Sequence, residues 1–221
     1  MPGRPDDSSL RLKKQQFVRS EIWNTAVDLF AQHGYDRTTI DDIATAAGVS
    51  RRTFFRYFAS KDDVMVQATD TYGDLLVDAV KESAGAAPLQ IVEGAVRRLA
   101  AFVVLQPRAR LAMKIVLENP GARGAQLSEY SVITERVAEA FAAAGAGGGG
   151  HAPTLLAGLT FVLLNRVFQS WYERSGEIGP IVDEVVAAFH DLTRTPRQHA
   201  ARHGHPSVGK PRPSRRLQNA R

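Results

Sequence analysis

The sequence predicts an all-α protein of about nine helices, and three observations support this fold class. Apolar residues recur three or four positions apart almost throughout the chain, which is the spacing of a helix face. No segment sustains the alternation of apolar and polar residues that is typical of a strand. Gly, Pro and capping residues separate the periodic segments at the points where helices would begin and end. With 221 residues and 44% hydrophobic content, the chain can form a sizeable core.

An apolar stripe at positions 22, 26, 29 and 30 predicts the first helix, and Gly34 stands where a helix C-terminus favours the left-handed conformation. Thr39 and Asp42 have a spacing like that of a capping box and predict the start of a second helix, which Gly48 ends. Ser50 caps a third helix that runs to about Phe58.

Ser60 and Asp63 begin a fourth predicted helix, whose apolar stripe extends from position 64 to position 79. Pro88 begins a fifth helix, and Pro107 ends it. A short sixth helix continues to about position 118, and the turn signal Asn119-Pro120-Gly121 separates it from a seventh that runs to about position 141.

The glycine-rich stretch 145–150 precedes the eighth predicted helix, Thr154 to Glu173. This helix is apolar nearly all round, so it is expected to be buried on more than one side. Pro180 begins the ninth helix, which extends to about Arg194.

Charge divides the chain more sharply than the net value of +5 implies. Residues 1–61 hold 10 Lys or Arg and 7 Asp or Glu, residues 62–194 hold 11 and 16, and residues 195–221 hold 7 basic residues and no acidic one. We expect a flexible arm over 1–14, a basic domain over 15–60 that meets a polyanion, an acidic helical domain over 61–194, and a disordered basic tail over 195–221.

Several functional classes are excluded or disfavoured by composition. The absence of cysteine excludes a disulfide framework, a thiolate metal site and a cysteine nucleophile, and it fits a reducing cytoplasm. The longest near-apolar run, Leu155 to Leu164, is too short to span a bilayer, and the N-terminus does not have the pattern of a signal peptide. We therefore expect a cytoplasmic protein that needs no membrane. Neither HExxH nor GxSxG occurs, so we also expect that the protein is not an enzyme and needs no cofactor or metal.

Residues 38–61, TTIDDIATAAGVSRRTFFRYFASK, carry the information about function. Two short helices joined by a tight glycine-containing turn predict a helix-turn-helix. At 100° per residue, the second helix buries Phe54 and Phe58 and presents Arg51, Arg52 and Arg56 on its other side. Such arginines can donate to O6 and N7 of guanine. The alternative is a helical hairpin with a solvated basic face, but the caps, the turn and the buried aromatic residues together favour DNA binding.

The stretch from Arg19 to about Gln67 resembles the N-terminal domain of TetR/AcrR-family transcriptional regulators. The family pattern A..LF...GY..TT...IA..AGVS..T.F.YF.SK is matched at Ala26, Leu29, Phe30, Gly34, Tyr35, Thr38, Thr39, Ile43, Ala44, Ala47, Gly48, Val49, Ser50, Thr53, Phe55, Tyr57, Phe58, Ser60 and Lys61. The run from Arg52 to Phe58 is also similar to a branch that contains mycofactocin-associated regulators.

The resemblance implies a homodimeric, ligand-responsive repressor that leaves an inverted-repeat operator when a small molecule binds. It implies phosphate contacts at Thr38 or Thr39, Ser50, Tyr57 and Lys61, and groove-facing positions at Arg51, Arg52, Thr53 and Arg56. Where the family usually has tyrosine this chain has Phe55, which we expect to touch a thymine methyl group or a sugar. The tail should add DNA affinity without sequence preference.

The resemblance also implies that the C-terminal domain dimerises through its last two helices and encloses a pocket between its middle helices. Candidate interface residues are Leu163, Val167, Val185 and Phe189. Candidate pocket residues are Phe102, Met113, Tyr130, Phe168 and Trp171, which predict a largely apolar effector, although each of them also fits a simple core position. Two alternatives remain: an all-α enzyme or carrier that contains a helix-turn-helix, and a constitutive DNA-binding protein without an effector.

Overall fold

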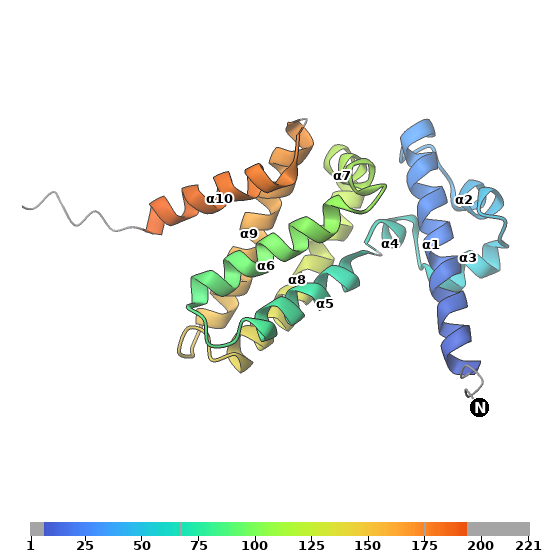
Figure 1. The fold of residues 1–221 in the computed structure, drawn as a ribbon. Helices are drawn as coiled ribbons and strands as arrows, with labels where there is room; N and C mark the ends of the chain where they lie inside the picture. Colours follow the sequence, from blue (N-terminus) through green and yellow to red (C-terminus); the bar gives the residue numbers. More distant parts are fainter. Residues whose placement is uncertain (1–6, 67, 175, 194–221) are drawn as a thin grey trace, which may run out of the picture.

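The computed structural model describes residues 7–66, 68–174 and 176–193, and within them the chain forms ten helices and no strand (Figure 1). The helices are α1 (Asp7–His33), α2 (Ile40–Ala46), α3 (Arg51–Tyr57), α4 (Lys61–Val66), α5 (Ala68–Glu82), α6 (Pro88–Val104), α7 (Ala109–Glu118), α8 (Pro120–Ala143), α9 (Ala152–Glu173) and α10 (Ile178–Thr193). The predicted all-α class is confirmed. The helix predicted to begin at Ser60 corresponds to α4 and α5, on either side of residue 67.

Helix α1 begins earlier than the sequence analysis expected. The flexible arm expected over residues 1–14 is wrong for residues 7–14, which belong to α1, whereas residues 1–6 lie outside the described part of the chain. Residues 10–17 are exposed and make no core contact, so packing does not explain this extension. Leu, Arg, Lys and Gln dominate these positions, and their high helix propensity continues the turns of the packed segment that follows.

The helix-turn-helix has the local geometry that its sequence predicts. Thr39 accepts a hydrogen bond from the backbone of Asp42, whose carboxylate accepts one from the Thr39 backbone, so the capping box is complete. Gly48 in the turn has φ of +66°, a conformation that side chains disfavour. Ser50 accepts from the backbone of Thr53 at the start of α3. These caps explain why helices as short as α2 and α3 begin where they do, and Gly48 explains why α2 ends.

The apolar core around α1–α3 is completed by segments far along the chain. Phe54 and Phe58 lie in one apolar cluster with residues of α1, and this cluster also contains Val64 and Met65 of α4 and Ile115 and Val116 of α7. The domain boundary expected after residue 60 therefore falls inside this cluster. Helices α1–α3 are called the head below, and α5–α10 the body. The two are connected by α4 and by α7 of the body, which both pack against α1 (Figure 1).

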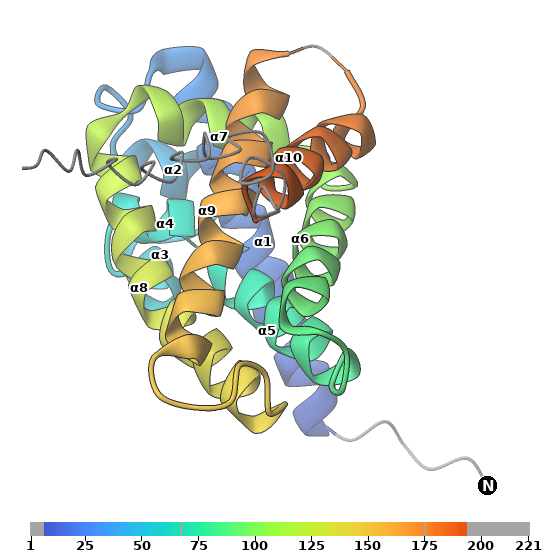
Figure 2. The ribbon, with the colours of Figure 1, turned by 90° about the vertical axis from the view of Figure 1, so that its left-hand side faces the viewer.

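The body is a helical bundle with its own apolar core, separate from the cluster of the head. This core is built around α9, which packs against α6, α7, α8 and α10 (Figure 2). Ala157 and Val167 of α9 are completely buried. By length and composition alone α9 could cross a membrane. Its position at the centre of the bundle accounts for the same apolar character, because a core helix must bury more than one face.

Three of the four candidate dimer residues are buried inside the protomer, so the structure corrects that assignment. Leu163, Val167 and Val185 belong to the body core, and the partly buried Phe189 packs against it. The outward strip of α9 contains Leu155 and Val162 instead, at 70% and 65% exposure. Periodicity identifies the apolar faces of a nearly all-apolar helix but does not say which face the protomer itself covers. The basic tail expected over 195–221 lies outside the described residues.

Candidate DNA-binding surface and effector cavity

Helix α3 presents a basic face to solvent and anchors itself with aromatic side chains. Arg51, Arg52 and Arg56 are exposed, whereas Phe54 and Phe58 are buried in the head core. Phe55 is 44% exposed and lies edge-on to the ring of Phe54. The structure thus separates the two faces of α3 as the sequence predicts.

The arginines differ in their contacts within the head. Arg51 donates two hydrogen bonds to the Asp41 carboxylate of α2, at 2.7 and 2.8 Å, and its guanidinium lies 5.5 Å from the centre of the Phe55 ring. Arg56 lies over the Tyr57 ring at 4.9 Å and donates to the Tyr57 hydroxyl. Both guanidinium groups are therefore held close to the surface of the head by contacts within it.

Ser50 and Thr53, expected at the DNA surface, also bond to each other. Their hydroxyl oxygens lie 2.9 Å apart, and Ser50 is exposed while Thr53 is partly exposed. The pair caps α3, and hydroxyl groups on this surface can also donate to phosphate oxygens.

The structure corrects the interpretation of Thr38 as a phosphate contact. Its side chain is 3% exposed, and its hydroxyl donates to the carbonyl oxygens of Gly34 at 2.8 Å and Leu29 at 3.4 Å. Thr38 thus completes the C-terminus of α1, where carbonyl groups lack helical partners. The neighbouring Thr39 is exposed and is the member of the pair that can reach a phosphate.

Lys61 connects α4 to the segment between α1 and α2, and it also adds positive charge at the edge of the head. Its ammonium donates to the backbone oxygens of Tyr35 at 2.7 Å and Thr38 at 3.4 Å, and it lies 4.3 Å from the centre of the Tyr35 ring. An ammonium has three donors, so two are used here and one remains for a phosphate. The Tyr35 hydroxyl donates to Asp62, and burial followed by this bond raises the pKa of that phenol.

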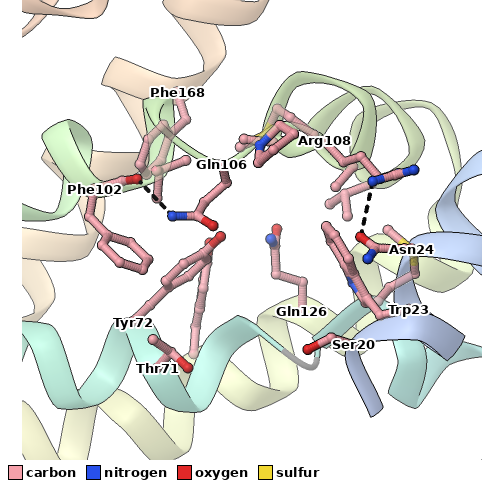
Figure 3. A pocket seen from close by; sticks show the side chains of 18 residues that line it. Ser20, Trp23, Asn24, Thr71, Tyr72, Phe102, Gln106, Arg108, Gln126 and Phe168 are labelled. Atoms are coloured by element: carbon pink, nitrogen blue, oxygen red, sulfur yellow. Dashed lines mark hydrogen bonds between the residues drawn. The ribbon is translucent and has the colours of Figure 1, made fainter. Parts of the chain in front are cut away.

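A cavity of about 430 Å³ lies where the head meets the body (Figure 3). Four of the five candidate pocket residues line it: Phe102, Met113, Tyr130 and Phe168. Trp171 does not. Its ring is buried in the body core beside the Arg110 guanidinium, 4.8 Å from the ring centre, so its assignment to the pocket is corrected.

The cavity wall combines aromatic rings with uncharged polar groups. Tyr72, Gln106 and Gln126 join the residues above, and Figure 3 shows the side chains of Tyr72 and Gln126 extending into the space. Burial raises the pKa of Tyr72 to about 12, and burial also raises the pKa of Tyr130, so both hydroxyl groups stay protonated near neutral pH.

One edge of the cavity is an ion pair between head and body. Arg108, just before α7, donates to both carboxylate oxygens of Asp28 on α1, at 2.8 and 2.7 Å, and to Asn24 at 3.2 Å. The hydrogen bond from Arg108 is the main cause that lowers the pKa of Asp28. Trp23 and Asn24 of α1 also line the cavity, so its wall includes part of the head.

The sequence analysis did not identify the polar part of this wall, the Arg108–Asp28 pair, or Asp41 as the partner of Arg51. Gln106 and Gln126 are isolated glutamines in the sequence, and Tyr72 fits the apolar stripe of its helix equally well as a core residue. The Arg108–Asp28 pair joins residues 80 positions apart. No local spacing connects such residues, because the packing of α1 against α7 brings them together.

A helix-turn-helix head with outward arginines, attached to a helical body with an internal cavity, defines a helix-turn-helix DNA-binding regulator. A family model described as "Bacterial regulatory proteins, tetR family" matches residues 22–68. The putative mycofactocin biosynthesis transcriptional regulator MftR of Mycobacterium tuberculosis is 32% identical over 145 residues, which are 62% of this chain and 69% of MftR. The HTH-type transcriptional regulator TcmR of Streptomyces glaucescens is 37% identical over 94 residues, so the match spans 42% of each chain.

Solved structures of regulators share the fold over most of the chain. NalD, described as the secondary repressor of the MexAB-OprM multidrug efflux pump in Pseudomonas aeruginosa, is 16% identical with a TM-score of 0.60, over 80% of this chain and 96% of NalD. The fatty acid degradation regulator FadR from Bacillus halodurans is 18% identical with a TM-score of 0.59, over the same shares of the two chains. The chain belongs to the TetR family and is a DNA-binding transcriptional regulator, which confirms the family predicted from its motif.

Proposed function

We propose that this protein is a cytoplasmic, homodimeric repressor that binds an inverted-repeat operator and releases it when a small, largely apolar molecule enters the cavity. The observation that supports this function best is the position of the cavity. Its wall contains Trp23 and Asn24 of α1, the helix that also packs against α2 of the helix-turn-helix. A molecule in the cavity therefore touches the element that positions α3.

The DNA contacts in this proposal come from one surface of the head. Arg51, Arg52 and Arg56 face the major groove, and Phe55 contacts a thymine methyl group or a sugar. Thr39, Ser50, Thr53, Tyr57 and Lys61 contact the backbone or the groove edge at the border of this surface. Two copies of α3 in a dimer enter successive major grooves about 34 to 36 Å apart, or further if the bodies spread them.

The dimer contact in this proposal is the outward strip of α9 around Leu155, Leu159 and Val162. Leu155 and Val162 are largely exposed and Leu159 is partly buried, at positions that share one side of the helix. Large exposed apolar side chains in a row favour burial against a second protein surface. A second copy provides the same strip, as a two-fold interface requires.

Selection of bound fragments from genomic DNA tests the function directly. The full chain is expected to select an inverted repeat, and addition of the cognate small molecule is expected to release it. Selection of sites without two-fold symmetry would contradict the dimeric arrangement. Failure to select any preferred site would contradict sequence-specific repression, while release by no small molecule would support the constitutive alternative.

A further inference from the structure

We propose that the cavity takes an uncharged, flat aromatic ligand that carries oxygen atoms, and that this ligand lies directly against α1 of the DNA-binding head. The proposal rests on the function proposed above, because it names the ligand class of the same cavity. Four properties of the wall lead to it: ring faces, uncharged hydrogen-bonding groups, the balance of charge, and the origin of the lining residues.

Aromatic rings enclose the cavity from several helices. Trp23 comes from α1, Tyr72 from α5, Phe102 from α6, Tyr130 from α8 and Phe168 from α9. Tyr72 and Phe102 meet edge to face, with ring centres 6.3 Å apart. Rings of a ligand can stack on such faces or meet their edges, so a flat aromatic molecule matches the wall better than a chain does. A volume of about 430 Å³ suits a small organic ligand.

Uncharged polar groups occupy specific places on this aromatic wall. Gln106 donates to the Phe102 backbone oxygen at 3.3 Å, which leaves its amide oxygen as an acceptor (Figure 3). Gln126 extends into the cavity from the opposite side, and the hydroxyl groups of Tyr72 and Tyr130 remain protonated. Carboxamides and phenols donate and accept, so they complement carbonyl and hydroxyl oxygens of a ligand.

Charge on the wall argues against an ionic ligand. Among the lining residues that the structure describes, Arg108 alone carries a charge, and Asp28 binds its guanidinium through two hydrogen bonds. A cationic ligand finds no carboxylate on the described wall. An anionic ligand competes with Asp28 and lies close to its negative charge. Either ion would lose hydration without a matching partner, which is costly.

The ligand would contact the head through α1. Trp23 and Asn24 contribute to the cavity wall, and Asn24 accepts from Arg108 at its edge. Trp23 provides a direct probe, because the chain has two tryptophans and Trp171 lies outside the cavity. In the full-length Trp171→Phe variant, tryptophan fluorescence reports Trp23 alone.

The experiment compares five probes on this variant by calorimetry and by quenching of Trp23. The probes are 1-hydroxyanthraquinone, which is flat and neutral, anthracene, which lacks oxygen, anthraquinone-2-sulfonate, an anion, proflavine, a cation, and 1-decanol, a neutral chain. The hydroxyanthraquinone is expected to bind about 10-fold more tightly than the others and to quench Trp23. Equal or tighter binding of the anion, the cation or the chain would overturn the proposal.

Matched variants separate ligand contacts from general damage to the cavity. Gln106→Leu and Gln126→Leu are each expected to weaken binding of the hydroxyanthraquinone roughly 2- to 10-fold, the value of one hydrogen bond, and to strengthen anthracene binding. Gln15→Leu, at an exposed position of α1 that does not line the cavity, is expected to change neither. Equal weakening of both probes would overturn the assignment of the glutamines as ligand contacts.

A parallel measurement of operator binding distinguishes this proposal from the function on which it rests. Quenching of Trp23 by the hydroxyanthraquinone with unchanged operator affinity would support the ligand class and contradict ligand-controlled repression. Operator release by a small molecule that leaves Trp23 fluorescence unchanged would support controlled repression and overturn the proposed ligand position.

Discussion

Individual arginines on α3 differ in what holds them, although all three are exposed. Arg51 is bound by Asp41, and Arg56 lies against Tyr57. Arg52 has no hydrogen bond, ion pair or ring contact among the described residues, so it reaches a base without first leaving a partner. A side chain that exchanges an ion pair for a base contact gains less free energy on binding.

Arg52→Ala is therefore expected to reduce operator affinity by about 1–3 kcal/mol and to relax the preference at one position in each half-site. Arg51→Ala, one residue away, serves as the comparison and is expected to relax base preference less. Titration of operators with single-base changes measures both effects. An unchanged preference profile in Arg52→Ala would show that this arginine does not contact a base.

Lys61 combines a structural and an electrostatic role. Because its ammonium bonds to carbonyl oxygens of residues 35 and 38, Lys61→Met is expected to destabilise the protein by about 1 kcal/mol. It should also weaken binding to all DNA sequences alike and lower the salt dependence by about one unit. Thermal unfolding and salt titrations measure the two effects, with the exposed Lys14→Met as a control for stability. A variant as stable as the wild type would argue against the structural role.

At the scale of elements, α9 shows how one apolar helix serves two surfaces. Its inner sides hold the body together, while Leu155 and Val162 face outward. Adjacent residues 162 and 163 lie on opposite sides of this division, with exposures of 65% and 7%. The same substitution at these two positions should therefore have different consequences.

Val162→Glu is expected to give a monomer that keeps its helical circular dichroism, because the charge lies in the proposed dimer contact. Leu163→Glu is expected to destabilise the fold itself by about 3 kcal/mol or more, since a carboxylate would be buried without a partner. Sedimentation and thermal unfolding separate the two outcomes. A monomeric wild type, or a Val162→Glu dimer as tight as the wild type, would disprove the proposed interface.

At the scale of the whole molecule, the head and the body share a core and an ion pair. The Arg108–Asp28 pair stabilises the position of α1 relative to the body. Its side chains are 33% and 40% exposed, so solvent screening limits the contribution to about 0.5–1 kcal/mol. Because the folded pKa of Asp28 lies below its ordinary value of 3.8, this stability is present above that pH and disappears as the pH falls through the folded pKa.

Asp28→Asn is expected to be less stable than the wild type near neutral pH and to lose this difference as the pH falls through the lowered pKa of Asp28. Urea unfolding at several pH values measures the difference. A difference that stays constant down to the lowest pH would mean that the charge of Asp28 does not contribute.

Local spacing and a continuous motif within residues 19–67 were sufficient to predict most of the helices, the caps of α2 and α3, the helix-turn-helix and the family. They did not predict the early start of α1 or the division between α4 and α5. The sequence also identified four cavity residues from the aromatic and sulfur side chains of the central helices. Only the packing between helices shows which side of α9 the protomer covers, that Thr38 points inward, and which polar groups join the cavity wall. These features depend on contacts between residues far apart in the chain, and helical periodicity describes one helix at a time without specifying its neighbours.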